Sequence, residues 1–218
     1  MKIGVFDSGV GGLSVVRAIE AALPDHEVIF ASDTEHIPYG TKPPAEVLGY
    51  VVPILEGLIA KGCDVLVIAC NTVTTHHAPA LRSRFSIPII GIEPMVKPAA
   101  KLTKSGVIAV CATPSTLASG RYDWLKRTYA AGLSVIEPDC SQWTSMIEAE
   151  RVNEMELDAM VDSLIGQGAD VIVLGCTHYH WIEREITSAA AGRAAVVQPE
   201  SAVVRQLKRI IATPAPPA

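Results

Sequence analysis

The sequence has few aromatic and few charged residues. Aromatic residues make up 5% of the 218 positions and charged residues 19%, whereas apolar residues make up 49%. This apolar content excludes an intrinsically disordered chain, which would be poor in apolar residues and rich in net charge. Because Val, Ile, Leu and Ala must form most of the core, the composition favours parallel sheets covered by helices.

The sequence also lacks long basic runs and long apolar runs. The net charge is −5, so we expect no nucleic-acid partner. The longest uninterrupted apolar runs have about six residues, too few to span a bilayer. The first residues, "MKIGVFDSG", turn polar at Asp7 and do not resemble a signal peptide. We therefore expect a cytoplasmic protein that does not bind membranes.

The five cysteines do not form a pattern typical of disulfides or structural zinc. They are odd in number and include no C-x-x-C pair. We expect reduced thiols. For Cys63, Cys111 and Cys140 we expect the ordinary role of a small buried apolar side chain.

Strand-like apolar runs alternate with helical patterns along the chain. The runs "IGVFDS", "CDVLVIAC", "GVIAVCAT" and "ADVIVLGC" each precede a helical stretch, which indicates βα units and parallel sheets. A long helical pattern extends from about residue 145 to 167. Pro79 lies inside another helical stretch, which it should interrupt or bend.

Two segments of the chain repeat each other. Residues 58–72 read "LIAKGCDVLVIACNT" and residues 164–178 read "LIGQGADVIVLGCTH", with seven of fifteen positions identical at an offset of 106. We infer two α/β halves of similar plan, each with a cysteine at the carboxyl end of one strand. Open α/β sheets bind their ligands at that edge.

Cys70 and Cys176 are the matched cysteines of the repeat. Each follows an apolar run and precedes a polar pair, Asn71–Thr72 or Thr177–His178. A helix should begin just beyond each thiol, and a helix N-terminus favours thiolates and binds carboxylates. Two such thiols could remove a proton from one face of a carbon and deliver one to the other.

Asp7 and His178 are the nearest candidates to assist these thiols. Asp7 ends the first predicted strand, and His178 is two residues from Cys176. In "DSGVGG", Asp7 could instead be a turn residue, or could form an anion-binding loop with Ser8. The loop lacks the G-x-G-x-x-G order and the Walker lysine, so we do not expect a nucleotide.

Cys176, His178 and His180 also raise the possibility of a zinc or iron site. At a strand-to-helix turn these side chains should point in different directions, and the sequence offers no evident further ligand. We therefore expect no metal.

Four motifs spread over most of the chain resemble those of the glutamate racemases, in the aspartate/glutamate racemase superfamily. They are "DSGVGGLSV" (7–15), "PYG" (38–40), "ACNT" (69–72) and "GCTHY" (175–179). These bacterial enzymes need no cofactor and supply D-glutamate for peptidoglycan. The resemblance implies a cytoplasmic homodimer whose substrate is glutamate or a related acidic amino acid. It also implies two pseudosymmetric α/β domains, 1–94 with about 197–218 and about 95–196, with the active site in the cleft between them.

The resemblance further implies the residues of the active site. Cys70 and Cys176 would be the two acid–base thiols, assisted by Asp7 and His178, with Glu148 as a further catalytic group. The residues that would hold the substrate are Asp7, Ser8, Pro38, Tyr39, Gly40, Asn71, Thr72, Thr113, Thr116, Thr177 and His178.

Two features depart from the pattern of that family. Proline usually follows "GCTHY", where this chain has His180. The segment before the functional glutamate is usually apolar and contains proline, and here it reads "DCSQWTSMIE" (139–148). Because this segment helps to shape the pocket, two alternatives stay open. One is a racemase or isomerase for another acidic substrate such as aspartate, and the other is an α/β protein that binds an amino acid without catalysis.

Overall fold

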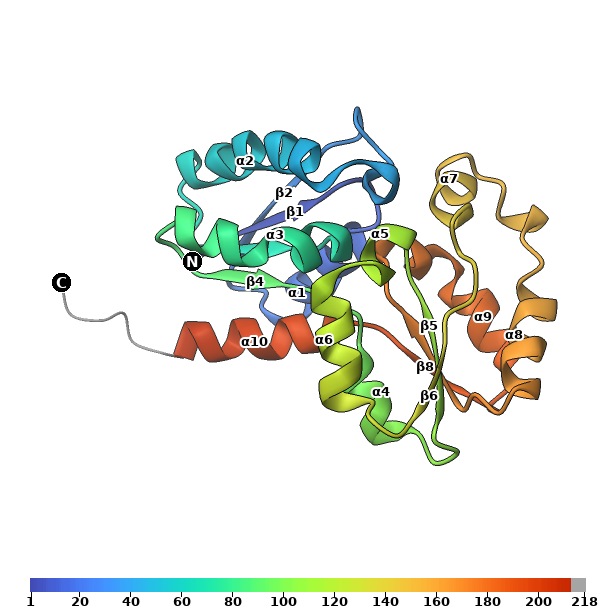
Figure 1. Cartoon of the computed structure of the whole chain (residues 1–218). Helices are drawn as coiled ribbons and strands as arrows, with labels where there is room; N and C mark the ends of the chain where they lie inside the picture. Colours follow the sequence, from blue (N-terminus) through green and yellow to red (C-terminus); the bar gives the residue numbers. More distant parts are fainter. Residues whose placement is uncertain (213–218) are drawn as a thin grey trace.

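The computed structural model describes residues 1–212 and contains two four-stranded parallel sheets, each covered by helices (Figure 1). Residues 213–218, which the sequence assigns to the first domain, lie outside the described part. The predicted fold class, two parallel-sheet α/β halves, is confirmed. Within residues 1–212, none of the helices combines the length and the apolar character needed to cross a membrane.

The first sheet has the strand order β2-β1-β3-β4. Its strands and their helices are β1 (Lys2–Asp7), α1 (Leu13–Ala22), β2 (Glu27–Ser32), the 3-10 turn η1 (Tyr39–Thr41), α2 (Pro44–Ala60), β3 (Val65–Ile68), α3 (Asn71–Arg84) and β4 (Ile89–Gly91). Successive residues of β1 point to opposite faces: Ile3 and Val5 join the core under α1, and Phe6 joins the core under α2 and α3.

The second sheet repeats this plan with the order β6-β5-β7-β8. Its elements are α4 (Val96–Leu102), β5 (Val107–Cys111), α5 (Pro114–Leu117), α6 (Gly120–Tyr129), β6 (Ser134–Ile136), α7 (Trp143–Glu148), the 3-10 turn η2 (Val152–Glu154), α8 (Leu157–Gly166), β7 (Val171–Leu174), the 3-10 turn η3 (Thr177–Ile182), α9 (Glu183–Ala190) and β8 (Ala195–Val197). Helices α8 and α9 cover one face, and α4 and α6 cover the other.

The chain crosses between the halves twice, after β4 and again after β8. The last helix, α10 (Glu200–Ala212), follows the second sheet in sequence but packs on α1 and β4 of the first half (Figure 1). Its Val203 and Leu207 are buried in the core formed with α1. The predicted first domain likewise combines residues 1–94 with a C-terminal segment. The exact domain bounds stay a prediction.

The glycine and the aspartate of the sequence repeat have structural roles. Gly62 and Gly168 have φ values of +84° and +96° and end helices α2 and α8. The Asp64 carboxylate accepts a hydrogen bond from the Lys2 backbone N–H at 2.8 Å, and the Asp170 carboxylate accepts one from the Lys104 N–H at 2.7 Å. Each aspartate thus ties its strand to the segment at the start of the neighbouring strand.

Two local expectations differ from the structure. α3 runs through Pro79 without a break, so the predicted interruption was wrong, while a bend at Pro79 stays a prediction. Val73 and Leu81, on either side of the proline, are both buried in the core, and their packing helps to hold the helix where proline removes a hydrogen bond. The pattern over 145–167 is not one helix. The chain leaves α7 at Glu150, which has a φ of 56°, and Arg151 N–H closes the end on the Met146 carbonyl.

The positive φ at Gly62 predicts a large effect of adding a single methyl group. Gly62→Ala should lower the free energy of unfolding by about 1–2 kcal/mol, because an alanine in the left-handed region is strained. Gly57→Ala is the matched control: it lies in α2 with open space around it, and it should raise stability by about 0.5–1 kcal/mol. Urea unfolding measures both. A Gly62→Ala variant as stable as the original chain would contradict this account.

Candidate active site

The functional candidates lie at the carboxyl ends of the central strands of both sheets. Asp7 is the last residue of β1. Cys70, Thr113 and Cys176 each lie two residues beyond the ends of β3, β5 and β7. Because the strands of each sheet are parallel, their carboxyl ends gather along one edge, where such sheets bind ligands.

A small cavity between the two halves joins these strand ends. It is lined by Ser8, Ile37, Pro38, Tyr39, Gly40, Thr41, Cys70, Asn71, Thr72, Thr113, Pro114, Ser141, Thr144, Cys176, Thr177 and His178. Its volume is about 20 Å³, enough for about one water molecule. As it stands, the cavity is therefore smaller than an amino acid, and binding of one requires its walls to move.

Cys70 is a buried thiol on the first-half side of this cavity. It directly precedes α3, and its Sγ lies 3.5 Å from the Ser8 Oγ. Burial, together with the nearby Asp7 carboxylate, raises the pKa of Cys70 to about 12, against the opposing effect of the Ser8 contact. Cys70 is therefore a proton-bearing thiol at neutral pH.

Asp7 lies behind the cavity wall and has no exposed surface. Its carboxylate accepts a hydrogen bond from the Gly12 backbone N–H at 2.7 Å, and another from the Thr177 hydroxyl at 3.2 Å. Burial raises the pKa of Asp7 to about 6, although the positive charge of His178 opposes this. The contact with Thr177 joins the two halves directly.

Cys176 faces the cavity from the second half and has a histidine and a glutamate behind it. The His178 Nδ1 lies 3.8 Å from the Cys176 Sγ, and the His178 Nε2 lies 2.5 Å from a Glu148 carboxylate oxygen. Burial alone would lower the pKa of His178, but hydrogen bonds with Cys176 and Glu148 raise it to about 11. The same hydrogen bond from His178 lowers the pKa of Glu148. The imidazolium can therefore donate to the sulfur on one side and to the carboxylate on the other.

The glycines of "DSGVGG" allow the loop after β1 to touch the loop after β7. A methyl group at Gly11 would lie 2.6 Å from the backbone of Thr177 and His178. One at Gly9 would lie 2.8 Å from the His178 ring. We call residues 8–12 the glycine loop. Gly11 thus allows a close approach to the backbone of the second half, and Gly9 a close approach to its side chains.

Hydroxyl groups and one amide complete the polar wall. The Thr72 Oγ1 lies 3.1 Å from that of Thr113, which donates to Thr116 at 3.0 Å. Asn71 is 3% exposed, and neither its amide nitrogen nor its amide oxygen has a hydrogen-bond partner. Since buried polar groups are normally paired, Asn71 is a group that a bound ligand could satisfy.

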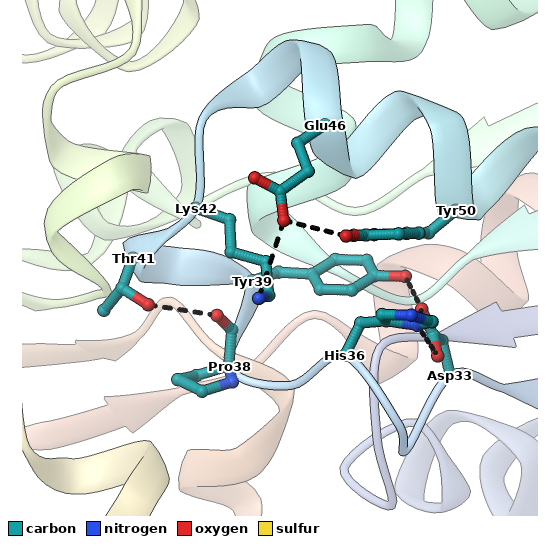
Figure 2. Close-up of polar contacts among 8 residues, drawn as sticks. All are labelled: Asp33, His36, Pro38, Tyr39, Thr41, Lys42, Glu46 and Tyr50. Carbon is teal, nitrogen blue, oxygen red and sulfur yellow. Dashed lines mark hydrogen bonds and ion pairs between the residues drawn. The ribbon is translucent and has the colours of Figure 1, made fainter.

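The segment with Tyr39 is held in place by a network of side chains (Figure 2). The Tyr39 hydroxyl donates to the Asp33 carboxylate at 2.6 Å, and the His36 Nδ1 lies 2.8 Å from the same group. The His36 ring stacks on Tyr50 of α2, with ring centres 3.8 Å apart. Through Asp33 and His36, these contacts link Tyr39 at the cavity to Tyr50 on α2 and so hold Tyr39 in position.

Most of the residues implied by the family resemblance line the cavity, but three of them do not. Asp7, Thr116 and Glu148 lie behind it and reach it through Thr177, Thr113 and His178 respectively. The lining residues that the sequence interpretation missed are Ile37, Thr41, Pro114, Ser141 and Thr144. The first three are next to predicted residues in the sequence, and this adjacency could have indicated them. Ser141 and Thr144 lie in the segment 139–148 that the family resemblance associates with the pocket, but nothing in the sequence indicated which of its side chains line the cavity.

Metal-ligating side chains do not converge here. Within residues 1–212, no three His, Cys, Asp or Glu side chains form a group that could hold a metal ion. His178 points to Glu148, whereas His180 points to Gln198.

Comparison with known proteins places this cavity in context. Residues 3–207 match the sequence profile of a family described as Asp/Glu/Hydantoin racemase. The glutamate racemase of Ectopseudomonas mendocina (strain ymp) is 40% identical over 214 residues, which make up 96% of this chain and 81% of that protein.

Two solved structures are similar along almost the whole chain. Glutamate racemase from Escherichia coli, in complex with L-glutamate and the activator UDP-MurNAc-ala, has a TM-score of 0.87 and 32% identity. The alignment covers 99% of this chain and 84% of that one. Glutamate racemase from Francisella tularensis, in complex with D-glutamate, has a TM-score of 0.78 and 27% identity, covering 96% and 80%.

The buried carboxyl of Asp7 predicts a stability that depends on pH. Since burial raises its pKa from the ordinary value of 3.8 to about 6, the contribution of Asp7 to stability should fall as the pH rises from 4 to 6. Asp7→Asn removes this charge and should raise the free energy of unfolding by about 1–3 kcal/mol at pH 7.5. The gain should shrink as the pH falls towards 4. Urea unfolding at pH 4.5 and 7.5 tests this, and a variant less stable than the original chain at pH 7.5 would refute it.

Proposed function

Because the chain belongs to the Asp/Glu/hydantoin racemase family, it is an isomerase, and we propose that it interconverts L- and D-glutamate. In this proposal two cysteines transfer the α-proton and no cofactor takes part. The glutamate bound in the two similar structures supports this substrate. We also propose that the protein acts as a homodimer in the bacterial cytoplasm, where its D-glutamate would serve peptidoglycan synthesis and so cell shape.

One observation supports the two-cysteine reaction above all others. Cys70 and Cys176 line one cavity from equivalent strand ends of the two halves. Each sulfur has its own proton-handling neighbours: Ser8 contacts Cys70, and His178 contacts Cys176. A carbon bound between the two halves would have a thiol available on each face.

The proposed reaction moves one proton on and one proton off the α-carbon. In one direction Cys176, as a thiolate paired with the His178 imidazolium, takes the α-proton and becomes a thiol. The electron pair of the broken C–H bond stays on the α-carbon. The Cys70 thiol then gives its proton to the opposite face, which inverts the centre and leaves Cys70 as a thiolate. The reverse direction uses the same steps in the opposite order.

Hydrogen-bond donors must stabilise the charge that develops on the substrate. Without a cofactor, the negative charge spreads into the α-carboxylate, where fixed donors stabilise it. The Asn71 amide and the hydroxyls of Ser8, Thr72 and Thr113 line the cavity and can serve this purpose. The Asn71 amide is unpartnered in the structure, so it can bind substrate without first breaking another hydrogen bond.

The contact of Glu148 with His178 favours an enzyme over a binding protein without catalysis. Although the segment around Glu148 differs from the family pattern, its carboxylate lies 2.5 Å from the His178 Nε2. This ion pair holds the imidazole charged and oriented, with its Nδ1 towards Cys176. The proton-handling group behind Cys176 is thus complete.

Incubation with amino acids in D₂O tests the function. Starting from either enantiomer of glutamate, the optical activity should fall to zero while the α-proton signal in the NMR spectrum disappears, because solvent deuterium enters at the α-carbon. Aspartate, which is one methylene group shorter, should react about 10- to 200-fold more slowly. Faster reaction of aspartate would overturn the substrate assignment. No exchange with either amino acid would overturn the racemase proposal.

The two thiols predict a specific pattern of variants. Cys70→Ser and Cys176→Ser should each lower kcat by at least about a hundredfold, because a serine hydroxyl is a far weaker acid than a thiol. Circular dichroism should show an unchanged fold. Cys63→Ala, away from the cavity, is the matched control and should keep kcat. Near-normal turnover in either serine variant would rule out a two-cysteine mechanism.

A further inference from the structure

His180 lies in the same short turn as Thr177 and His178 but does not line the cavity. Its Nδ1 lies 2.9 Å from the Gln198 side-chain oxygen and 3.4 Å from a Glu200 carboxylate oxygen. Gln198 and Glu200 belong to the second crossing between the halves, where β8 ends and α10 begins. The side chain therefore connects the turn after Cys176 to the helix that returns to the first half.

The connection continues from Glu200 into the first half. The Ser14 hydroxyl of α1 lies 2.9 Å from the same Glu200 oxygen and 3.2 Å from the Gly11 carbonyl oxygen. The side chain of Glu200 is 17% exposed, and Ser14 is buried. We call His180, Gln198, Glu200 and Ser14 the His180 bridge.

The bridge ends where the glycine loop touches the turn after Cys176. Gly11 packs against the backbone of Thr177 and His178 so closely that a methyl group there would lie 2.6 Å away. The turn that contains His180 is thus joined to the glycine loop in two ways. It contacts the loop directly, at Gly9 and Gly11, and it is linked to the loop through Glu200 and Ser14.

The charges of the bridge favour the same arrangement. Glu200 raises the pKa of His180, and the hydrogen bond from His180 helps to lower the pKa of Glu200 although burial opposes this. Each group therefore favours the charged form of the other, on top of the 3.4 Å contact between them. Glu183 also faces His180, at 3.5 Å, but it belongs to the same segment as His180 and is 40% exposed. Of these two carboxylates, the one on Glu200 links the two halves.

We infer that His180 is a positioning residue, which acts through Glu200 and Ser14 to hold the Thr177–His178 turn against the glycine loop that follows Asp7 and begins with Ser8. The inference rests on the proposed racemase function in so far as this turn carries catalytic groups. Loss of the bridge should loosen the second-half wall of the cavity, and with it Cys176, while both cores stay intact.

Kinetics of a mutant cycle test the role in catalysis. His180→Ala and Glu200→Gln should each lower kcat/KM for glutamate about fivefold, the effect of losing a partly buried ion pair. The double variant should be no slower than either single variant, because both remove the same contact. Glu183→Gln is the matched control and should keep kcat/KM. Unchanged kcat/KM in His180→Ala, or single effects that multiply in the double variant, would overturn the inference.

Alkylation of Cys176 tests the positioning role without any need for turnover. Cys176 is partly exposed, whereas Cys111 is fully buried in the second-half core. With iodoacetamide and peptide mass spectrometry, His180→Ala should label Cys176 several-fold faster than the original chain does, with Cys111 unlabelled. An unchanged Cys176 rate, or an equal increase at Cys111 that reports general unfolding, would overturn the inference. If the original chain failed to racemise glutamate, only the proposed function would fail, and this labelling result would still stand.

Discussion

The close approach of two loops, one from each half, determines the rest of the site. The glycine loop meets the turn after Cys176 at a distance that leaves no space for a side chain at Gly11. Because the loops belong to different sheets, this contact fixes how the two sheets face each other. The Thr177 hydroxyl then reaches Asp7, and the two cysteines line one cavity. A methyl group at Gly11 would separate all of these groups at once.

The close contact of the two halves also buries ionisable side chains. The two halves differ in how these side chains are stabilised. In the second half, Glu148 is the direct partner of the His178 imidazolium, so both groups stay ionised. In the first half, burial raises the pKa of Asp7 to about 6, although His178 and hydrogen bonds from the Gly12 N–H and the Thr177 hydroxyl oppose this. The carboxyl whose charge is disfavoured by burial is thus the one that helps to raise the pKa of Cys70.

The sequence predicted what depends on local pattern and on repetition. Buried βα units indicated the two parallel sheets, and the offset repeat alone paired Cys70 with Cys176. Features that depend on packing were not predictable. Helix α7 ends at Glu150, which adopts the left-handed conformation that glycine usually takes at this position. Helix α3 continues past Pro79. In the segment "DSGVGG", Asp7 and Ser8 predicted a turn or an anion-binding loop. The contact of Gly11 with the second half was not predicted, because a single chain segment does not reveal which distant backbone it will touch.

The two thiols occupy equivalent positions in the two halves, but the side chains around them differ. The proposed reaction does not require these side chains to be the same. Enantiomers have equal free energy in water, so kcat/KM for racemisation must be the same in both directions whatever lies on each side of the substrate. Only kcat and KM can differ separately between the two enantiomers. A serine and a buried carboxylate near Cys70, with an imidazolium and a glutamate behind Cys176, therefore need not act as chemical equivalents. The repeated fold places the two sulfurs at equivalent strand ends, while different neighbouring side chains assist each thiol in the proposed proton transfer.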